Sequence, residues 1–197
     1  GGVDEEARAE AAGKAAGLVV LAKGGTATDA GNAAASAART AARTTVYCSS
    51  SGDPHFRMFT GHSHHFQGVG EHVLAQSYDA KFTVHTCQQP WRRPTDRVST
   101  NRALAIGSKN ARVTMKYNGE VRVNGAIIGT DGTYSGVKIS QGKSLFQFPD
   151  GELVAVRPYG SGWWGSHMTV RVRLPKTVYA SNVQGLCGAF HKDHTGA

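Results

Sequence analysis

The stretch Cys48–Gly68, CSSSGDPHFRMFTGHSHHFQG, divides the chain into two parts of different composition. Residues 3–44, which precede it, are rich in alanine, the strongest helix former. The residues that follow it alternate between apolar and polar in short runs, which is the period of a half-buried strand. The sequence therefore predicts an N-terminal helical segment and, from residue 45 onward, a mainly β domain.

The chain has 197 residues, of which 40% are hydrophobic and 18% are charged, so it can bury the core of one moderate domain with an appendage. The formal net charge of +8 favours polyanionic neighbours such as acidic glycans. The densest basic cluster, Arg92, Arg93 and Arg97, is short. We therefore expect a solvated basic surface and no nucleic-acid groove.

The longest apolar run, Leu18–Ala22, is far shorter than the roughly 18 residues that a membrane-spanning helix needs, so no membrane span is expected. The sequence begins at Gly1 without a methionine, a signal peptide or a tag. We expect it to be a mature or excised piece of a longer protein.

Residues 1–44 are predicted to form a helical hairpin or a linker. Ala7–Ala22 contains strong helix formers, and Lys23–Gly25 follows as a helix stop. Thr26–Asp29 supplies capping side chains for a second helix, Ala30–Arg43, which carries a stripe of alanines. The alternatives are a partly helical linker and a fragment of a neighbouring domain.

The segment LVVLAKGGTATDAGNAAASAA, residues 18–38, is similar to the early helix–Gly-Gly–helix segment of gamma-glutamyltransferases. It contains no catalytic threonine motif. We interpret this resemblance as similar local architecture, without a shared activity.

Short strands are predicted throughout residues 45–197, which reads as an antiparallel β-sandwich or open barrel. The predicted strands are 73–74, 82–84, 98, 103–106, 113–115, 121–123, 126–128, 137–139, 145–148, 153–156 and 168–174. The turn signals between strands are Asn118-Gly119, Asn124-Gly125, Asp131-Gly132 and Asp150-Gly151. Neither a βαβ alternation nor a glycine-rich phosphate loop is present.

Two stretches carry a family likeness: C-x3-GDPHFRMFTGHSHHFQGVGEHVLA at 48–75 and GLCGAF at 185–190. Together they resemble the von Willebrand factor type D domain over about residues 45–197. The resemblance implies an antiparallel β-sandwich, in agreement with the alternating pattern.

The resemblance also implies a disulfide between Cys48 and Cys187, the positions of the family's first cysteine and of its GLCG cysteine. Such a bond implies an oxidising compartment. Cys87 is left without a nearby partner, and two states stay open for it: a buried thiol or an intermolecular bridge.

The family's calcium site is degenerate in this chain. The resemblance maps its ligands to Thr60 and to residues after GLCG, among them His191 and Asp193. Calcium needs several oxygen ligands, mainly carboxylates, and most are missing here. We therefore expect no bound calcium and no other cofactor.

Asp53-Pro54 is the most chemically suggestive bond, because in some members of the family the GDPH motif is cleaved there. The Asp53 carboxyl can attack its own carbonyl, and His55 is placed in sequence to protonate the proline nitrogen. The alternative is that the two residues simply form a turn.

Two other clusters are candidate sites. The histidines could suggest zinc or pH sensing, but we interpret them as surface residues without metal: His62, His64, His65 and His72. Tyr159, Trp163 and Trp164 form a glycine-flanked aromatic loop. It is a possible docking patch for a partner or glycan. The alternatives are that the loop packs over the end of the sandwich or that the helical hairpin packs against it.

No G-x-S-x-G, H-E-x-x-H or C-x-x-C motif occurs, so no enzyme is indicated. The prediction is an extracellular structural module that acts by self-association within a larger secreted or surface assembly, with acidic glycans as a second partner. The alternatives are a carbohydrate- or lipid-binding module and a self-cleaving precursor fragment.

Overall fold

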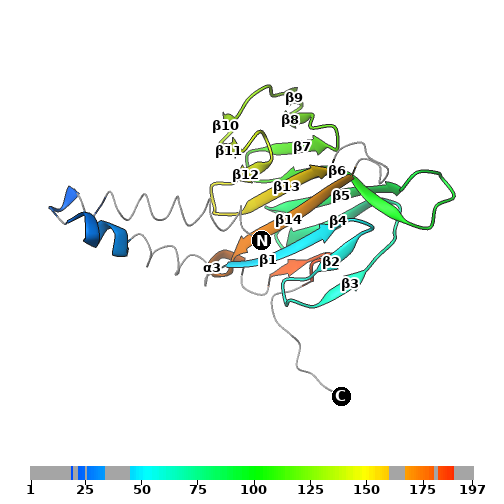
Figure 1. The fold of residues 1–197 in the computed structure, drawn as a ribbon, viewed down its shortest axis with the longest axis horizontal. Helices are drawn as coiled ribbons and strands as arrows, with labels where there is room; N and C mark the ends of the chain where they lie inside the picture. Colours follow the sequence, from blue (N-terminus) through cyan, green and yellow to red (C-terminus); the bar gives the residue numbers. More distant parts are fainter. Residues whose placement is uncertain are drawn as a thin grey trace, which may run out of the picture. The chain divides into compact units, whose positions relative to one another are not determined.

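The computed structural model describes residues 19, 22–24, 26–33, 45–159, 167–179 and 182–188. The chain divides into two units, residues 1–45 and 46–197. The second unit is built from two antiparallel sheets and one short helix, α3 (Lys176–Tyr179), as Figure 1 shows. The prediction of a mainly β domain is thus confirmed. Within the described residues, no helix has the length and apolar character needed to cross a membrane.

The first sheet has eight strands in the order β10-β11-β12-β13-β14-β1-β2-β3. Their bounds are β10 (Gly132–Tyr134), β11 (Val137–Ser140), β12 (Leu145–Gln147), β13 (Leu153–Tyr159), β14 (His167–Pro175), β1 (Thr45–Ser51), β2 (His55–Arg57) and β3 (Ser63–His65). The strand that opens the domain, β1, therefore lies beside β14, one of the last.

The second sheet has seven strands in the order β15-β4-β5-β6-β7-β8-β9. Their bounds are β15 (Val183–Gln184), β4 (Gly70–Ser77), β5 (Thr83–Pro90), β6 (Ser99–Gly107), β7 (Arg112–Lys116), β8 (Val121–Val123) and β9 (Ala126–Ile127). Here too a late segment, β15, pairs with an early strand, β4.

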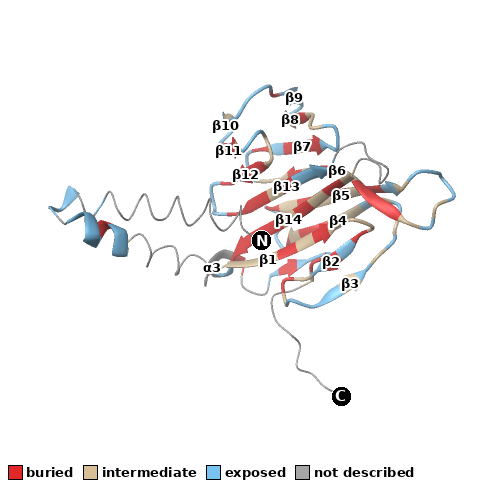
Figure 2. Ribbon diagram, viewed as in Figure 1, coloured by how far each residue is buried: buried red, intermediate tan, exposed pale blue. Residues whose placement is uncertain are grey.

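Both sheets contribute apolar side chains to one core, visible as the buried residues of Figure 2. Strand β14 illustrates the pattern: Met168, Val170 and Val172 are fully buried, whereas the residues between them are only partly covered. A period of two buries one face of a strand, which is the physical reason the sequence pattern predicted this strand well.

One predicted turn signal, Asp131-Gly132, does not form a tight hairpin turn. The chain bends at Thr130 and Asp131, β10 begins at Gly132, and the hairpin turn follows at Ser135-Gly136, both with positive φ (49° and 82°). The Asp131 carboxylate instead accepts hydrogen bonds from the backbone N–H groups of Gly142 and Lys143, at 3.0 and 2.7 Å. Its role is to hold a neighbouring loop.

In the first unit the described residues include the centre of the predicted hairpin. Gly24 has a φ of 80°, as expected for a glycine that ends a helix. Thr26 caps the next helix, because its Oγ1 accepts from the Asp29 N–H at 3.2 Å and donates to the Asp29 carboxylate at 2.6 Å. Most of the predicted hairpin, including most of its alanine stripe, lies outside the described residues.

Candidate functional site: the Asp53–Pro54 turn and the disulfide clamp

The Asp53–Pro54 bond lies in the tight turn between β1 and β2. Ser51 and His55 are the last paired residues of the two strands, so Gly52, Asp53 and Pro54 alone make the connection. Gly52 has a φ of 66°, which a residue with a Cβ adopts at a cost. The turn exposes the Asp53 side chain and holds it beside the start of β2.

Asp53, His55 and His65 form a chain of polar contacts at this turn. His55 Nε2 lies 2.6 Å from Asp53 Oδ1, and His55 Nδ1 lies 2.6 Å from His65 Nδ1. Which of the two Nδ1 atoms donates depends on the tautomers of the two rings. The pairing of β2 with β3, which places His55 opposite His65, brings the two rings together.

A groove of about 330 Å³ opens beside the turn. The lining comes from three parts of the chain: Gly52 and Asp53 in the turn, Trp91, Val98 and Thr100 at the β5–β6 end, and His167 at the start of β14. The Asp53 carboxylate is therefore reachable from a partly aromatic groove.

The other predicted histidines do not gather around one point. The His64 ring stacks on Phe56 at 5.0 Å, and the His72 ring packs edge-on against Phe66 at 4.9 Å. They act as packing groups of the β2–β4 region. Within the part of the chain that is described, no three His, Cys, Asp or Glu side chains are arranged to hold a metal ion.

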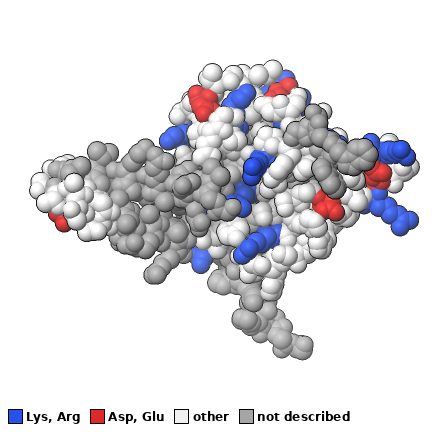
Figure 3. All heavy atoms as spheres, viewed as in Figure 1, with Lys and Arg blue, Asp and Glu red and all other residues white. Residues whose placement is uncertain are grey.

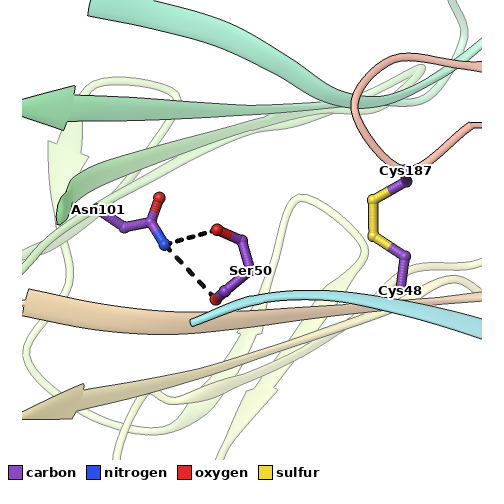
Figure 4. The surroundings of a disulfide bond; sticks show 4 residues. All are labelled: Cys48, Ser50, Asn101 and Cys187. Atoms are coloured by element: carbon purple, nitrogen blue, oxygen red, sulfur yellow. Dashed lines mark hydrogen bonds between the residues drawn. A yellow bond between two sulfur atoms is a disulfide. The ribbon is translucent and has the colours of Figure 1, made fainter. Parts of the chain in front are cut away.

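A disulfide joins Cys48 in β1 to Cys187 just beyond β15, the pairing that the family resemblance implied. The two Cα atoms are 5.7 Å apart, within the ordinary range for a disulfide. Figure 4 shows the bond bridging the ribbon of β1 and the loop near the end of the chain. Both cysteines are fully buried, so the bond is part of the core.

The GLCG segment docks on the strand that carries the VLA motif. The N–H groups of Leu186 and Cys187 donate to the carbonyls of Val73 and Leu74, at 3.0 and 2.9 Å. A Cβ at Gly185 would lie 2.9 Å from the same two carbonyl oxygens, too close for any other residue. The glycine of this motif is thus required by backbone packing, and the two quoted stretches meet in space.

The calcium-site positions are only partly described. Phe59 N–H donates to the Cys187 carbonyl at 3.1 Å, which holds the Thr60 turn against the GLCG segment. Thr60 Oγ1 is buried and has no hydrogen-bond partner among the described atoms. One neutral hydroxyl does not fit the carboxylate-rich set that calcium prefers. His191 and Asp193 lie outside the described residues.

Cys87 is a free, partly exposed thiol in β5. Burial raises its pKa above the usual value, and the charge of Glu71 on the paired strand β4 raises it further. The thiol is therefore weakly reactive at neutral pH, since the thiolate is the nucleophilic form.

Of the predicted docking patch, only Tyr159 is described. It ends β13, its ring stacks on His167 at 4.9 Å, and the Arg157 guanidinium lies 5.5 Å from the ring centroid. Trp163 and Trp164 lie outside the described residues.

Sequence reasoning missed a buried polar network centred on Asn101 in β6. Its Nδ2 donates to Ser50 Oγ at 2.9 Å and to the Met168 carbonyl at 3.2 Å, and its Oδ1 accepts from Thr86 Oγ1 at 2.7 Å. Asn101 is fully buried and thereby ties the seven-stranded sheet to β1 and β14 of the other sheet. Figure 4 shows its bond to Ser50, two residues from the disulfide.

A second missed pair is Glu152 with Tyr179. The Tyr179 hydroxyl donates to Glu152 Oε1, and both residues are buried. Burial, as the largest cause, raises the pKa of the Glu152 carboxyl and also that of the Tyr179 hydroxyl. The pair fastens α3 to the loop before β13.

The family model for the von Willebrand factor type D domain matches residues 48–195. Among curated proteins, SCO-spondin of Gallus gallus is 30% identical over 147 residues, which is 74% of this chain and 3% of that protein. Human zonadhesin (Homo sapiens) is 26% identical over 153 residues, which is 74% of this chain and 5% of that protein.

The chain thus spans only a few per cent of the length of these curated relatives. The match begins at Cys48 and includes Cys187, so it contains both ends of the disulfide as well as the turn with Asp53. Because the family model covers most of the sequence, the chain belongs to the von Willebrand factor type D domain family.

Proposed function

We propose that this chain is an extracellular, non-enzymatic assembly module of a larger secreted or surface protein, and that it acts by self-association. The observation that carries the proposal is the buried Cys48–Cys187 disulfide in a von Willebrand factor type D domain. Disulfides of this kind persist in oxidising compartments. We further infer that the two sheets form the sandwich of that family and that residues 1–44 form the helical hairpin predicted from the alanine pattern.

The mass of the chain in solution tests self-association. We expect a particle of at least two chains, measured by light scattering on a sizing column with and without reductant. If Cys87 forms the contact, reductant and Cys87→Ser both return the particle to one chain. If the contact is noncovalent, neither does. A single chain at the highest soluble concentration under every condition contradicts the proposal.

The calcium position supports a proposal of its own. We infer that this module assembles without calcium at the Thr60 position, because Thr60 offers one neutral oxygen where the family has a carboxylate. The mass measurement, repeated with a chelator, bears on this inference directly: assembly that disappears with the chelator would contradict it.

A second candidate function, self-processing, is favoured by the 2.6 Å contact between Asp53 and His55. In this reaction a carboxylate oxygen of Asp53 bonds to the Asp53 carbonyl carbon, the bond to the Pro54 nitrogen breaks, and that nitrogen takes a proton from His55. Water then opens the cyclic anhydride to leave a fragment that ends at Asp53. The exposed turn gives the carboxylate room for this attack.

Intact-mass analysis after incubation at mildly acidic pH tests self-processing. A fragment ending at Asp53 is the expected product, and His55→Gln is expected to slow its appearance about 100-fold if His55 is the proton donor. His62→Gln, which changes a histidine outside the contact, is the matched control. An intact mass that stays unchanged would rule out self-processing and would leave the assembly proposal unaffected.

A further inference from the structure

The strands of the eight-stranded sheet have an unusual charge composition. As described, they contain five Lys or Arg residues and no Asp or Glu: Arg57, Lys138, Arg157, Arg171 and Arg173. In the seven-stranded sheet part of the basic charge is offset by a carboxylate. Two of its cations, Lys116 and Arg122, both bind Glu120, at 3.0 and 2.8 Å. The described strands of the eight-stranded sheet thus carry five Lys or Arg and no acidic residue, whereas those of the seven-stranded sheet carry four Lys or Arg and one acidic residue, Glu71.

Register places several of these cations on the outer face of that sheet. In β13 and β14, Arg157 is paired with Thr169, whereas the neighbouring pair Val156 and Val170 points into the core. In β2, Arg57 is paired with Ser49 and flanks the buried Phe56. Successive residues of a strand point to opposite faces, so Arg57 and Arg157 both face outward.

Tyrosine rings organise the arginines into a row. The Arg57 guanidinium lies 5.0 Å from the Tyr47 ring centroid, and Arg171 lies 5.5 Å from the same centroid. Because β1 lies between β2 and β14, these three residues span three adjacent strands. Arg157 continues the row over Tyr159 on β13, at 5.5 Å. Figure 3 shows Lys and Arg side chains gathered over β13, β14 and β1.

The two outer members of the row are open to a ligand. Arg57 and Arg157 are exposed, and neither has a carboxylate partner among the described residues. The acidic side chain nearest in sequence to β2, Asp53, is bound by His55. Contact with tyrosine rings restricts the guanidinium groups and so lowers the entropy cost of binding an anion.

We propose that this arginine row, Arg57, Arg171 and Arg157 with Tyr47 and Tyr159, binds a sulfated acidic polysaccharide. Guanidinium groups form paired hydrogen bonds with sulfate and carboxylate, and a row across four strands matches a ligand whose anions repeat along a chain. A binder of single-stranded nucleic acid stacks bases on open aromatic faces. Here Tyr47 is contacted by guanidinium groups from both neighbouring strands. The inference rests on the proposed extracellular location and not on self-association.

Calorimetric titration of the full chain with heparin at low salt tests the proposal. The variant R57Q/R157Q is expected to bind about tenfold more weakly and to show a smaller dependence of affinity on salt, since two partly exposed charge contacts are lost. The matched control is K109Q/R112Q, which removes two exposed charges near the β6–β7 turn and is expected to change affinity less than twofold. R57K/R157K, which keeps the charges and removes the paired geometry, is expected to be intermediate.

Three outcomes would overturn the proposal: no heparin binding, equal losses in R57Q/R157Q and K109Q/R112Q, or single-stranded DNA binding more tightly through the same arginines. Equal losses would mean that net charge alone attracts the ligand. The thermal midpoint of each variant shows that it folds, and if R57Q/R157Q does not, R157Q alone serves, with an expected loss of about threefold. The mass of each variant in solution separates failure of this proposal from failure of self-association.

Discussion

Replacing Cys48 and Cys187 together with serine is expected to lower the free energy of unfolding by about 3–5 kcal/mol. The two cysteines are 139 residues apart, so the bond closes a very large loop. Closing this loop removes many conformations that the unfolded chain would otherwise adopt. In the chain-entropy model a loop of this length is worth about 5 kcal/mol, which is the upper end of the expected range. A loss of this size is a large fraction of the stability of an ordinary domain.

Urea denaturation of the double variant measures this loss. Cys87→Ser is the matched control, because it removes a thiol that takes part in no disulfide of the described structure, and we expect it to change stability by less than about 1 kcal/mol. Reductant added to the unmodified chain should reproduce the effect of the double variant. An unchanged denaturation midpoint in both experiments would contradict a structural role for the bond.

Asn101→Ala is expected to cost about 3 kcal/mol, the second large effect. The substitution removes the partner of Ser50 and Thr86 at once and leaves their hydroxyl groups buried without that partner. It also frees the Met168 carbonyl on the opposite sheet. Each buried polar group left without a hydrogen bond costs about 1–3 kcal/mol, although the costs within one network are not additive.

Asn110→Ala is the matched control for Asn101, because Asn110 is exposed in the turn between β6 and β7 and its loss is expected to be near zero. Denaturation curves of the two variants give the comparison. A cost below about 1 kcal/mol for Asn101→Ala would mean that the network is replaced by water or closes up after the change.

The sequence predicted strands whose apolar and polar residues alternate clearly, such as β14, and missed strands without that pattern, such as β3. In strand β14 apolar and polar residues alternate from Met168 to Leu174, and this strand was predicted correctly. Strand β3, Ser-His-His, has no apolar alternation because it lies at the edge of its sheet, and periodicity cannot detect it. The start of strand β10 was mistaken for a hairpin turn because Asp-Gly is a common turn signal, whereas the hairpin turn falls four residues later, at Ser135-Gly136.

The position of Asn101 shows why the buried polar network could not be predicted from the sequence. Cys87 pairs with Ala103, but the next residue, Gln88, pairs with Asn101, so Arg102 is an extra residue in β6. This bulge shifts the alternation by one and turns Asn101 inward, where the period of Leu104 and Ile106 would have turned it outward. The sequence Ser-Thr-Asn-Arg contains no signal that predicts a bulge.

The candidate site was predicted in part. Asp53 and His55 are close in sequence, so their contact was accessible to sequence reasoning, and the Cys48–Cys187 pairing followed from the family resemblance. His65 was not linked to His55, because their contact depends on the register of β2 with β3. The arginine row was missed for a similar reason: its members are scattered in sequence and meet only because β1 lies between β2 and β14.

The disulfide also determines how this module responds to a pulling force. Tension applied through the chain on either side of the module enters near Cys48 and leaves near Cys187, and the covalent bond carries it directly across. The segment from Cys48 to Cys187, with a sequence separation of 139 residues, has a contour length of about 480 Å that stays unavailable while the bond is intact. Reduction would release that length, so in the proposed larger assembly the intact bond would make this module an inextensible link.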